Sequence, residues 1–363
     1  MKNIYTKVLK KVEKFDVVGY SYSRNYIDGG VSKLSPYISR GIISTKTIYN
    51  NILNKGYELH QVQKFLQELC WRDYWQKKWQ QLGNIDFDLK NVQSPTLSFN
   101  LPAALIDHNT SISALDQSIK ELYDTGYMHN HLRMYLAGIC CNIGKYHWLK
   151  PAKWMYFNLL DGDWGSNALS WQWVAGTNSN KKYIANQENI NKYCHTKDLN
   201  TFLDKTYEEL TKYEDVPKEL VDETSIEYLY KLPENELFKV DYELPTFVYN
   251  SYNLDSNWKK GEKGNRILLF EPSHFKKYPI SNKVINFIIE LSKEIKGIKI
   301  AVMEFDELIQ LTKLKSELYY KEHPFNNHYL GNKEEREWIF PDVNATGSFF
   351  NYWKKGIKTY QKK

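Results

Sequence analysis

The stretch LLDGDWGSNALSWQWVAGT, residues 159–177, gathers chemistry that one short segment rarely holds together. Asp161 and Asp163 stand two residues apart and are followed by an Asn and three tryptophans. Tryptophan is large, and its ring usually finds a partner to stack on. Eight of the 11 tryptophans of the chain lie between Trp71 and Trp173. The first half of the chain is therefore the place to look for aromatic chemistry.

Length and composition describe an ordinary globular protein. The 363 residues predict two domains, or one large domain with an appendage. A hydrophobic content of 42% and a charged content of 25% are typical of soluble chains. No apolar run reaches the roughly 18 residues of a membrane span, and MKNIYTKVLKKVEKFD at the start lacks the apolar core of a signal peptide. We expect a cytoplasmic protein that does not enter a membrane.

Charge and cysteine content restrict the partners only weakly. A net charge of +6 mildly favours a polyanion such as nucleic acid. The four cysteines show no CxxC spacing and no paired framework: Cys70, Cys140, Cys141 and Cys194. Buried free thiols in a reducing compartment are the expected state, with an iron–sulfur site from all four as the alternative.

The spacing of hydrophobic residues differs from one part of the chain to the next. Residues 60–82 have apolar side chains at helical spacing, with Trp71, Trp75 and Trp79 on one face. Three further helical segments are predicted, over 111–126, 127–149 and 151–163. Residues 201–235 are charged and polar, as in a short helix or linker.

The last third has a different pattern. NRILLFEP (265–272) and IKIAVMEF (298–305) are apolar runs of strand length that flank an amphipathic helix over 280–297. This order predicts a parallel β-α-β unit. No glycine-rich turn follows the first strand, which disfavours a dinucleotide site and leaves a structural or accessory domain.

Three segments of the first half carry candidate site residues. In GGVSKLSPYISRG (29–41), small hydroxyl residues precede a helix that begins near Pro36; this arrangement suits either a phosphate seat or a plain helix cap. Glu68, Trp71 and Arg72 share one helix face, as a salt bridge beside a core ring or as a lined pocket.

The third segment, GYMHNHLRM (126–134), places Asn130, Arg133 and Met134 on one face of a helix in the same way. His129 and His131 are two residues apart, so on a helix they face apart and do not chelate one metal. We therefore predict no metal site.

Taken in order, the segments resemble the flavin-binding catalytic domain of the DNA photolyase/cryptochrome family. Residues 29–41 are similar to its TSxLSPYLxxG phosphate loop, and FLQELCWRDYW (65–75) to its FLxELxWREFY helix. TGYMHNHLRM (125–134) is similar to TGWMHNRxRM, and residues 159–177 to LxDxDxAxNxxxWQWxAGTG. Four motifs in the family's order form a specific signal.

The resemblance implies FAD as the cofactor and a role for each matching residue. The residues implied at the FAD phosphates are Ser32, Leu34 and Ser35. Those implied around the flavin are Arg72, Asn130, Arg133, Asp161, Asp163 and Asn167. Those implied against a pyrimidine dimer are Glu68, Trp71, Met134 and Trp173. Trp171 and Trp148 are the implied inner links of an electron-transfer chain, and together with Glu68 and Asn167 they form the implied catalytic set.

Departures from the family pattern accompany the match. The flavin motifs begin about 20 residues from Met1, so no antenna domain of the usual kind is expected before them. Val31 stands where the family often has Thr. The segment ALIDHNTSISALD (104–116) lacks the motif that the family usually has there, near the adenine end of FAD. The outermost tryptophan of the electron chain has no clear match.

The expected architecture is α+β and multidomain. It comprises an all-α FAD domain over 1–200, a linker over 201–235 and a smaller α/β domain over 236–363. The expected function is light-driven repair of cyclobutane pyrimidine dimers in damaged DNA. The alternatives are a cryptochrome-like blue-light sensor and a flavin-binding protein that has lost repair. Enzymes acting on (6-4) photoproducts carry a His pair where this chain has Asn130 and Met134, which favours the cyclobutane dimer.

Overall fold

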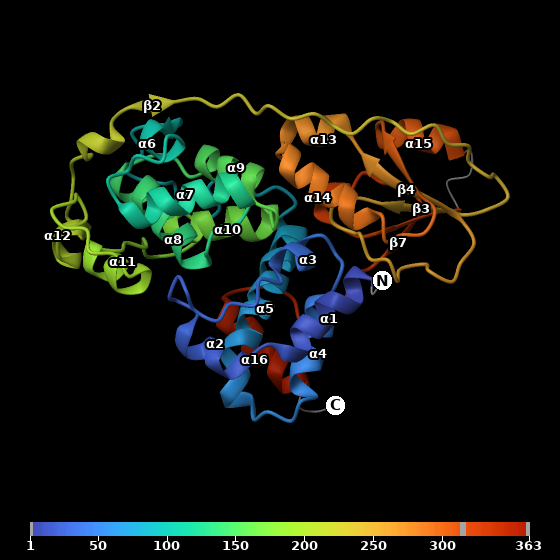
Figure 1. Cartoon of the computed structure of the whole chain (residues 1–363), viewed down its shortest axis with the longest axis horizontal. Helices are drawn as coiled ribbons and strands as arrows, with labels where there is room; N and C mark the ends of the chain where they lie inside the picture. Colours follow the sequence, from blue (N-terminus) through green and yellow to red (C-terminus); the bar gives the residue numbers. More distant parts are fainter. Residues whose placement is uncertain (1–2, 313–316, 361–363) are drawn as a thin grey trace. The chain divides into compact units, whose positions relative to one another are not determined.

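The computed structural model describes residues 3–312 and 317–360, as helices and a parallel sheet (Figure 1). The chain forms two compact units. The sheet unit comprises Met1–Val17, Ser32–Gly83 and Tyr228–Lys363, and the helical unit comprises Val18–Val31 and Asn84–Glu227. These units divide the chain differently from the boundaries expected at 200 and 236, which stay a prediction. The α+β, multidomain fold class is confirmed.

The helical unit contains the helices predicted between residues 111 and 163. Its main helices are α7 (Ser113–Thr125), α8 (Asn130–Gly138), α9 (Leu149–Asn158), α10 (Trp164–Ala175) and α11 (Gln187–Cys194). Its shorter elements are α2 (Val17–Ser23), β1 (Leu101–Pro102), α6 (Ala103–Ile106), α12 (Tyr207–Thr211), η2 (Lys218–Leu220) and β2 (Glu223–Thr224). The prediction of one helix over 127–149 is wrong in one respect. Helix α8 is followed by a single π-helical turn, η1 (Ile139–Ile143), and the helix ends there.

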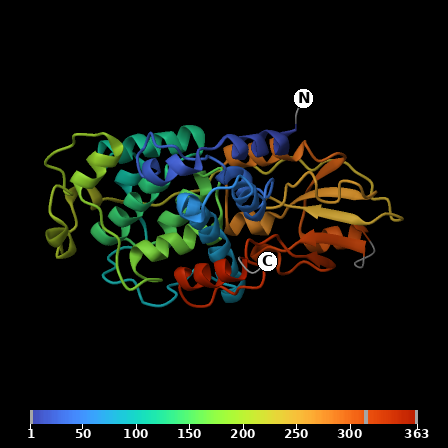
Figure 2. The same ribbon diagram turned by 90° about the horizontal axis from the view of Figure 1, so that it is seen from below.

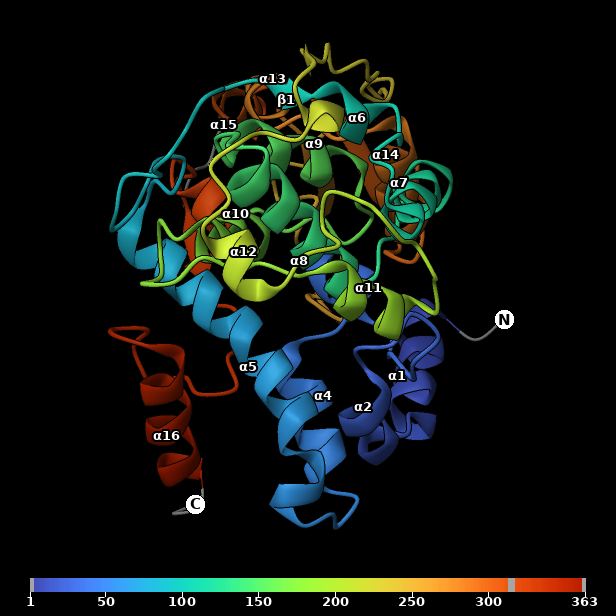
Figure 3. The same cartoon turned by 90° about the vertical axis from the view of Figure 1, so that its left-hand side faces the viewer.

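Local sequence explains where these helices begin and end. Gly126 ends α7 with a left-handed φ of 72°, and a Cβ there would lie 2.7 Å from the Leu160 side chain. Asp163 begins α10, because its Oδ1 accepts a hydrogen bond from the backbone N–H of Ser166 at 2.7 Å. Helix α10 packs against both α8 and α9, as the green helices in Figure 3 show. The motif residues of the unit therefore lie on helices in mutual contact.

The sheet unit is built on five parallel strands: β3 (Thr246–Tyr249), β4 (Asn265–Phe270), β5 (Ile298–Val302), β6 (Leu318–Lys321) and β7 (Asn332–Glu334). Their order is β5-β4-β3-β6-β7, and Figure 2 shows them side by side in orange to red. The predicted β-α-β unit is confirmed, since α14 (Asn282–Ser292) connects the parallel pair β4 and β5. That helix ends five residues before the predicted Gly297.

Helices complete the sheet unit. They are α1 (Ile4–Lys14), α3 (Ser35–Ser39), α4 (Thr45–Leu53), α5 (Leu59–Leu82), α13 (Pro272–Lys277), α15 (Phe305–Thr312), η4 (Pro324–Asn326) and α16 (Phe349–Tyr360). The helix predicted over 60–82 is confirmed as α5. Val248 of β3, Ile267 of β4 and Phe305 of α15 meet in one apolar core. Helix α16 lies alongside α5 (Figures 1 and 3).

Asp73 ties α5 to the C-terminal segment from within the core. Its Oδ1 accepts a hydrogen bond from Thr45 Oγ1 at 2.6 Å, and its Oδ2 accepts one from the Ile339 backbone N–H at 2.8 Å. Lys77, one turn further along, donates to the carbonyls of Phe340 and Val343. Burial raises the pKa of Asp73 from 3.8 to about 6 despite these donors.

The raised pKa of Asp73 has a consequence for stability. The folded state holds the proton more tightly than the unfolded state, so the free energy of unfolding falls as pH rises from about 4 to about 6. We expect the parent to lose about 2–3 kcal/mol relative to Asp73→Asn across this window. Urea unfolding of both proteins between pH 4 and 7.5 measures the difference. A difference that stays constant with pH would contradict the assignment.

Candidate functional site

Three predicted site residues of the helical unit share one face of α10. Asp163, Asn167 and Trp171 follow at i, i+4 and i+8. Asp163 caps the helix, and Asn167 Nδ2 donates to the Ala152 carbonyl of α9 at 2.8 Å. Trp171 is buried. Packing against α9 thus fixes this face of α10 through contacts within the protein itself.

An ion pair joins α8 to the turn before α10. Arg133 Nη2 lies 3.0 Å from Asp161 Oδ1 and 3.1 Å from Asp161 Oδ2, and Arg133 Nε donates to the Met128 carbonyl. The side chains of Arg133 and Asp161 are 20% and 6% exposed. Burial raises the pKa of nearby Tyr127 to about 12; Asp161 adds to the rise and Arg133 opposes it. Asp161 and Arg133 thus pair in a largely desolvated place.

The remaining predicted residues of α8 lie at its first turns. Asn130 is exposed, and Met134 is half-buried one turn later. The neighbouring histidines are engaged elsewhere: His131 Nδ1 lies 2.9 Å from the Asn25 carbonyl oxygen, and buried His129 accepts the His131 backbone N–H. Burial lowers the pKa of His131. Within residues 3–312 and 317–360, no cluster of three or more His, Cys, Asp or Glu side chains is arranged to hold a metal.

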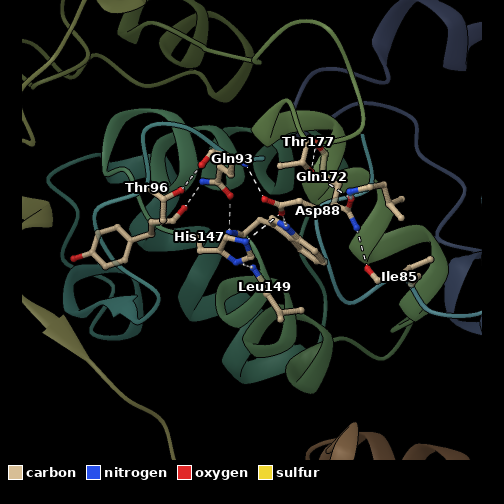
Figure 4. A network of polar contacts seen from close by, with 11 residues as sticks. Ile85, Asp88, Gln93, Thr96, His147, Leu149, Gln172 and Thr177 are labelled. Carbon is tan, nitrogen blue, oxygen red and sulfur yellow. Dashed lines mark hydrogen bonds and ion pairs between the residues drawn. The ribbon is translucent and has the colours of Figure 1, made fainter. Parts of the chain in front are cut away.

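Trp148 is part of a polar network that sequence reasoning missed. The ring is fully buried, and its Nε1 donates to Asp88 Oδ1 at 2.7 Å. Gln93 accepts the Trp148 backbone N–H through Oε1 at 3.0 Å. Figure 4 shows Asp88 directed toward His147, whose Nε2 lies 3.2 Å from the same carboxylate oxygen. Asp88 lies in a loop without periodicity, where only the spacing of Asp86 and Asp88 in IDFD (85–88) offered a signal.

Trp173 differs from the other tryptophan of the WQW motif. Its side chain is 38% exposed, whereas Trp171 is buried. The centroid of its ring lies 6.1 Å from that of the Tyr183 ring. A large exposed ring at the end of α10 can stack on a flat partner from outside.

The predicted phosphate loop belongs to the sheet unit. Lys33 adopts a left-handed φ of 50°, and Ser32 Oγ accepts the Leu34 backbone N–H at 3.4 Å. Leu34, not a serine, occupies the N-cap of α3, and no side chain caps that helix. The helix-cap interpretation of the two serines is therefore wrong. Arg72 Nη1 of α5 donates to Ser39 Oγ at 2.9 Å, which brings it to the helix that Ser35 begins.

Glu68 and Trp71 lie on the same helix α5. Glu68 is exposed, and Trp71 is half-buried. The Trp71 ring stacks on Phe349 of α16, with centroids 3.7 Å apart and planes 10° apart, and it tilts against Trp75 at 5.1 Å. One face of Trp71 is thus covered by an aromatic ring of the same unit, a contact that helical spacing alone did not predict.

A family model for the FAD binding domain of DNA photolyase matches residues 65–262, more than half of the chain. The chain belongs to the DNA photolyase/cryptochrome family. It carries the FAD-binding domain of that family, and FAD is its cofactor. The resemblance drawn from the four motifs is confirmed.

Curated relatives bear both names of the photolyase/cryptochrome family. A deoxyribodipyrimidine photo-lyase of Alkalihalophilus pseudofirmus is 29% identical over 180 residues, which cover 47% of this chain and 36% of the relative. A cryptochrome DASH of Danio rerio is 29% identical over 171 residues, covering 44% and 32%. The matched part thus spans about a third of these relatives' length.

Solved structures of photolyases and cryptochromes are also similar. A bacterial class III photolyase from Agrobacterium tumefaciens is 26% identical, with a TM-score of 0.43, over 52% of this chain and 42% of that one. A cryptochrome of Synechocystis is 22% identical with a TM-score of 0.44, over 52% and 43%.

The residues of the helical unit fit a polar ligand. A cation and a carboxylate are already paired at Arg133 and Asp161, so their mutual charge is balanced before a ligand arrives. The buried hydroxyl of Ser166, next to Asn167, has no hydrogen-bond partner within the described residues. A buried polar atom of this kind is costly unless a partner is supplied.

The cysteines and the helices show two general properties of the described residues. The four cysteines are free thiols; Cys70, Cys140 and Cys141 are buried and Cys194 is half-buried. Burial raises the pKa of Cys140 and of Cys70. Among the described helices, none combines the length and the apolarity needed to cross a membrane.

Proposed function

We propose that this chain repairs cyclobutane pyrimidine dimers in DNA by light-driven electron transfer from reduced FAD. The observation that carries the choice of lesion is the composition of α8. It begins with Asn130 and reaches Met134 one turn later, and neither side chain can donate a proton as an imidazolium does. His131 is tied to the Asn25 carbonyl, so it does not replace the missing acid. Cleavage of a cyclobutane dimer needs electron transfer and return, and no such acid.

In this proposal the FAD is held by the residues that match the family's motifs. The set at the phosphates comprises Ser32, Leu34 and Ser35, and the set around the flavin comprises Arg72, Asn130, Arg133, Asp161, Asp163 and Asn167. Arg72 and Arg133 are cations, and Coulomb attraction favours the anionic reduced flavin over the neutral one. Bound FAD supplies the light absorption and the one-electron chemistry.

The substrate side of the proposal uses the remaining residues. Glu68, Trp71, Met134 and Trp173 would contact a dimer flipped out of the duplex. Flipping costs a few kcal/mol and is cheapest for a lesion that stacks badly. Stacking on exposed Trp173 stabilises the flipped dimer by about 1–3 kcal/mol per base. Trp171 and Trp148 would conduct electrons to the flavin.

A second candidate is a cryptochrome-like blue-light sensor without repair. The stack of Phe349 on Trp71 favours it, because one face of the Trp71 ring is already covered and is closed to a base. Under this alternative the chain binds FAD and responds to light but leaves dimers intact. The cryptochrome DASH relatives are compatible with either candidate.

Side-by-side illumination of two oligonucleotides distinguishes the candidates. One carries a cyclobutane dimer and the other a (6-4) photoproduct; both are incubated with purified, chemically reduced holoprotein and sampled in blue light and in the dark. We expect light-dependent restoration of the dimer substrate and none of the (6-4) substrate. Restoration of the (6-4) lesion alone would overturn the lesion choice. A yellow, photoreducible protein that restores neither would favour the sensor.

A further inference from the structure

The carboxylate of Asp88 is surrounded by hydrogen-bond donors in the helical unit. Its Oδ1 accepts the indole N–H of Trp148 at 2.7 Å and faces His147 Nε2 at 3.2 Å, and its Oδ2 accepts the Gln93 backbone N–H at 2.8 Å. The network around it is drawn in Figure 4. Asp88 is thus a hydrogen-bond acceptor placed on the indole of one tryptophan.

The contact of His147 shows which of its nitrogens carries hydrogen. Nδ1 accepts the Leu149 backbone N–H at 3.4 Å, so in the neutral ring the proton resides on Nε2 and points to Asp88. The side chains of His147 and Asp88 are 14% and 15% exposed, and Phe99, which stacks on His147 at 4.9 Å, is 65% exposed. Trp148 itself is fully buried. A path from buried Trp148 to solvent therefore begins at Asp88.

We propose that Asp88 takes the indole proton of Trp148 when Trp148 is oxidised. This inference rests on the proposed electron-transfer chain. Removing an electron from an indole makes its N–H far more acidic, and the acceptor already lies at hydrogen-bond distance. The proton therefore does not have to reach solvent at the moment of oxidation.

The step balances in atoms and charge. Trp148 loses one electron, which passes by way of Trp171 to the photoexcited flavin, the one-electron oxidant. The bond between Trp148 Nε1 and its hydrogen breaks, and a bond between that proton and Asp88 Oδ1 forms. A neutral indolyl radical and a neutral carboxylic acid result. Returning the electron then requires returning the proton, which slows charge recombination.

The chain supplies a matched control two residues away. Asp86 Oδ1 accepts the indole N–H of Trp164 at 2.8 Å, and Trp164 is as fully buried as Trp148. Trp164 is not a member of the proposed electron chain. Asp88→Asn and Asp86→Asn are the same isosteric change, since an amide oxygen keeps the hydrogen bond but is too weak a base to take the proton.

Transient absorption of the FAD-loaded proteins after a light flash tests the proposal, because protonated and deprotonated tryptophan radicals absorb at different wavelengths. In the parent and in Asp86→Asn we expect the deprotonated radical, formed more slowly in D2O. In Asp88→Asn we expect the protonated radical and recombination faster by about tenfold or more, since positioned bases typically change rates by about 10²–10⁴-fold. Trp148→Phe, recorded alongside, identifies the signal that belongs to Trp148.

Each result bears on the inference. Equal radical spectra and lifetimes in the parent and Asp88→Asn, with normal flavin photoreduction, would overturn it while leaving the proposed function intact. Absence of any tryptophan radical or photoreduction in the parent would overturn it together with the proposed electron chain. Melting curves of the flavin-free proteins confirm that the three variants fold like the parent.

Discussion

Arg133→Gln is expected to lower the free energy of unfolding by about 2–4 kcal/mol, because it leaves the buried Asp161 carboxylate without its cation. The same change removes the contacts of Arg133 Nη2 with both Asp161 oxygens, at 3.0 and 3.1 Å, that hold α8 to the turn before α10. Since both residues belong to the proposed flavin environment, purified Arg133→Gln should retain little FAD. Urea unfolding and the flavin released on denaturation measure the two effects.

The helical unit offers a matched control for this ion pair. Lys212 and Glu208 lie 2.7 Å apart, but their side chains are 73% and 78% exposed. Water screens such a pair, so Lys212→Gln should cost at most about 1 kcal/mol and should leave FAD content unchanged. Arg133→Lys keeps the positive charge but lacks the planar guanidinium group, so its cost in free energy of unfolding should lie between those of the other two variants. A cost for Arg133→Gln no larger than that for Lys212→Gln would contradict the role assigned to the pair.

Trp171→Phe is expected to reduce photoreduction of bound FAD to a small fraction of the parent's rate. The reason is its position in the proposed chain as the first ring of the WQW motif, buried on the face of α10 that also carries Asp163 and Asn167. Phe is a much poorer electron donor than Trp. When the flavin is chemically reduced beforehand, dimer repair by the variant should match that of the parent.

Trp164→Phe separates this electron-transfer effect from a packing effect. Trp164 lies on the same helix and is also buried, so its replacement opens a comparable space in the core. It should leave photoreduction near the parent's rate. Rates measured under continuous blue light with an added reductant decide the matter; equal rates in Trp171→Phe and the parent would refute the assignment of Trp171.

Much of the architecture could be predicted because it depends on short-range chemistry. The 3.6-residue spacing of apolar side chains predicted α5, and Gly126 marked the end of α7 because it adopts a left-handed φ that other residues avoid. Two apolar runs with an amphipathic helix between them predicted the parallel pair β4 and β5. The family followed from four local motifs.

Other features depend on contacts between residues far apart in sequence. The expected domains joined residues 32–83 to the helical part. In the structure α5 packs with α16 in the sheet unit, and its Asp73 and Lys77 bond to residues 339–343, which precede α16. Nothing local to α5 specifies those carbonyls, because hydrogen bonds of this kind are chosen by which segments fold against each other. The domain boundaries at residues 200 and 236 stay a prediction.

The sequence by itself determined helices α5 and α7, the β-α-β unit, the FAD-binding family and the residue types available for the site. Only the tertiary structure decided what surrounds them: Asp88 on the indole of Trp148, and Phe349 on the ring of Trp71. Periodicity and capping act over about one helical turn and leave a mark on neighbouring residues. Burial and long-range hydrogen bonding act between segments separated by tens or hundreds of residues, and they set the protonation and the exposure on which the proposed chemistry depends.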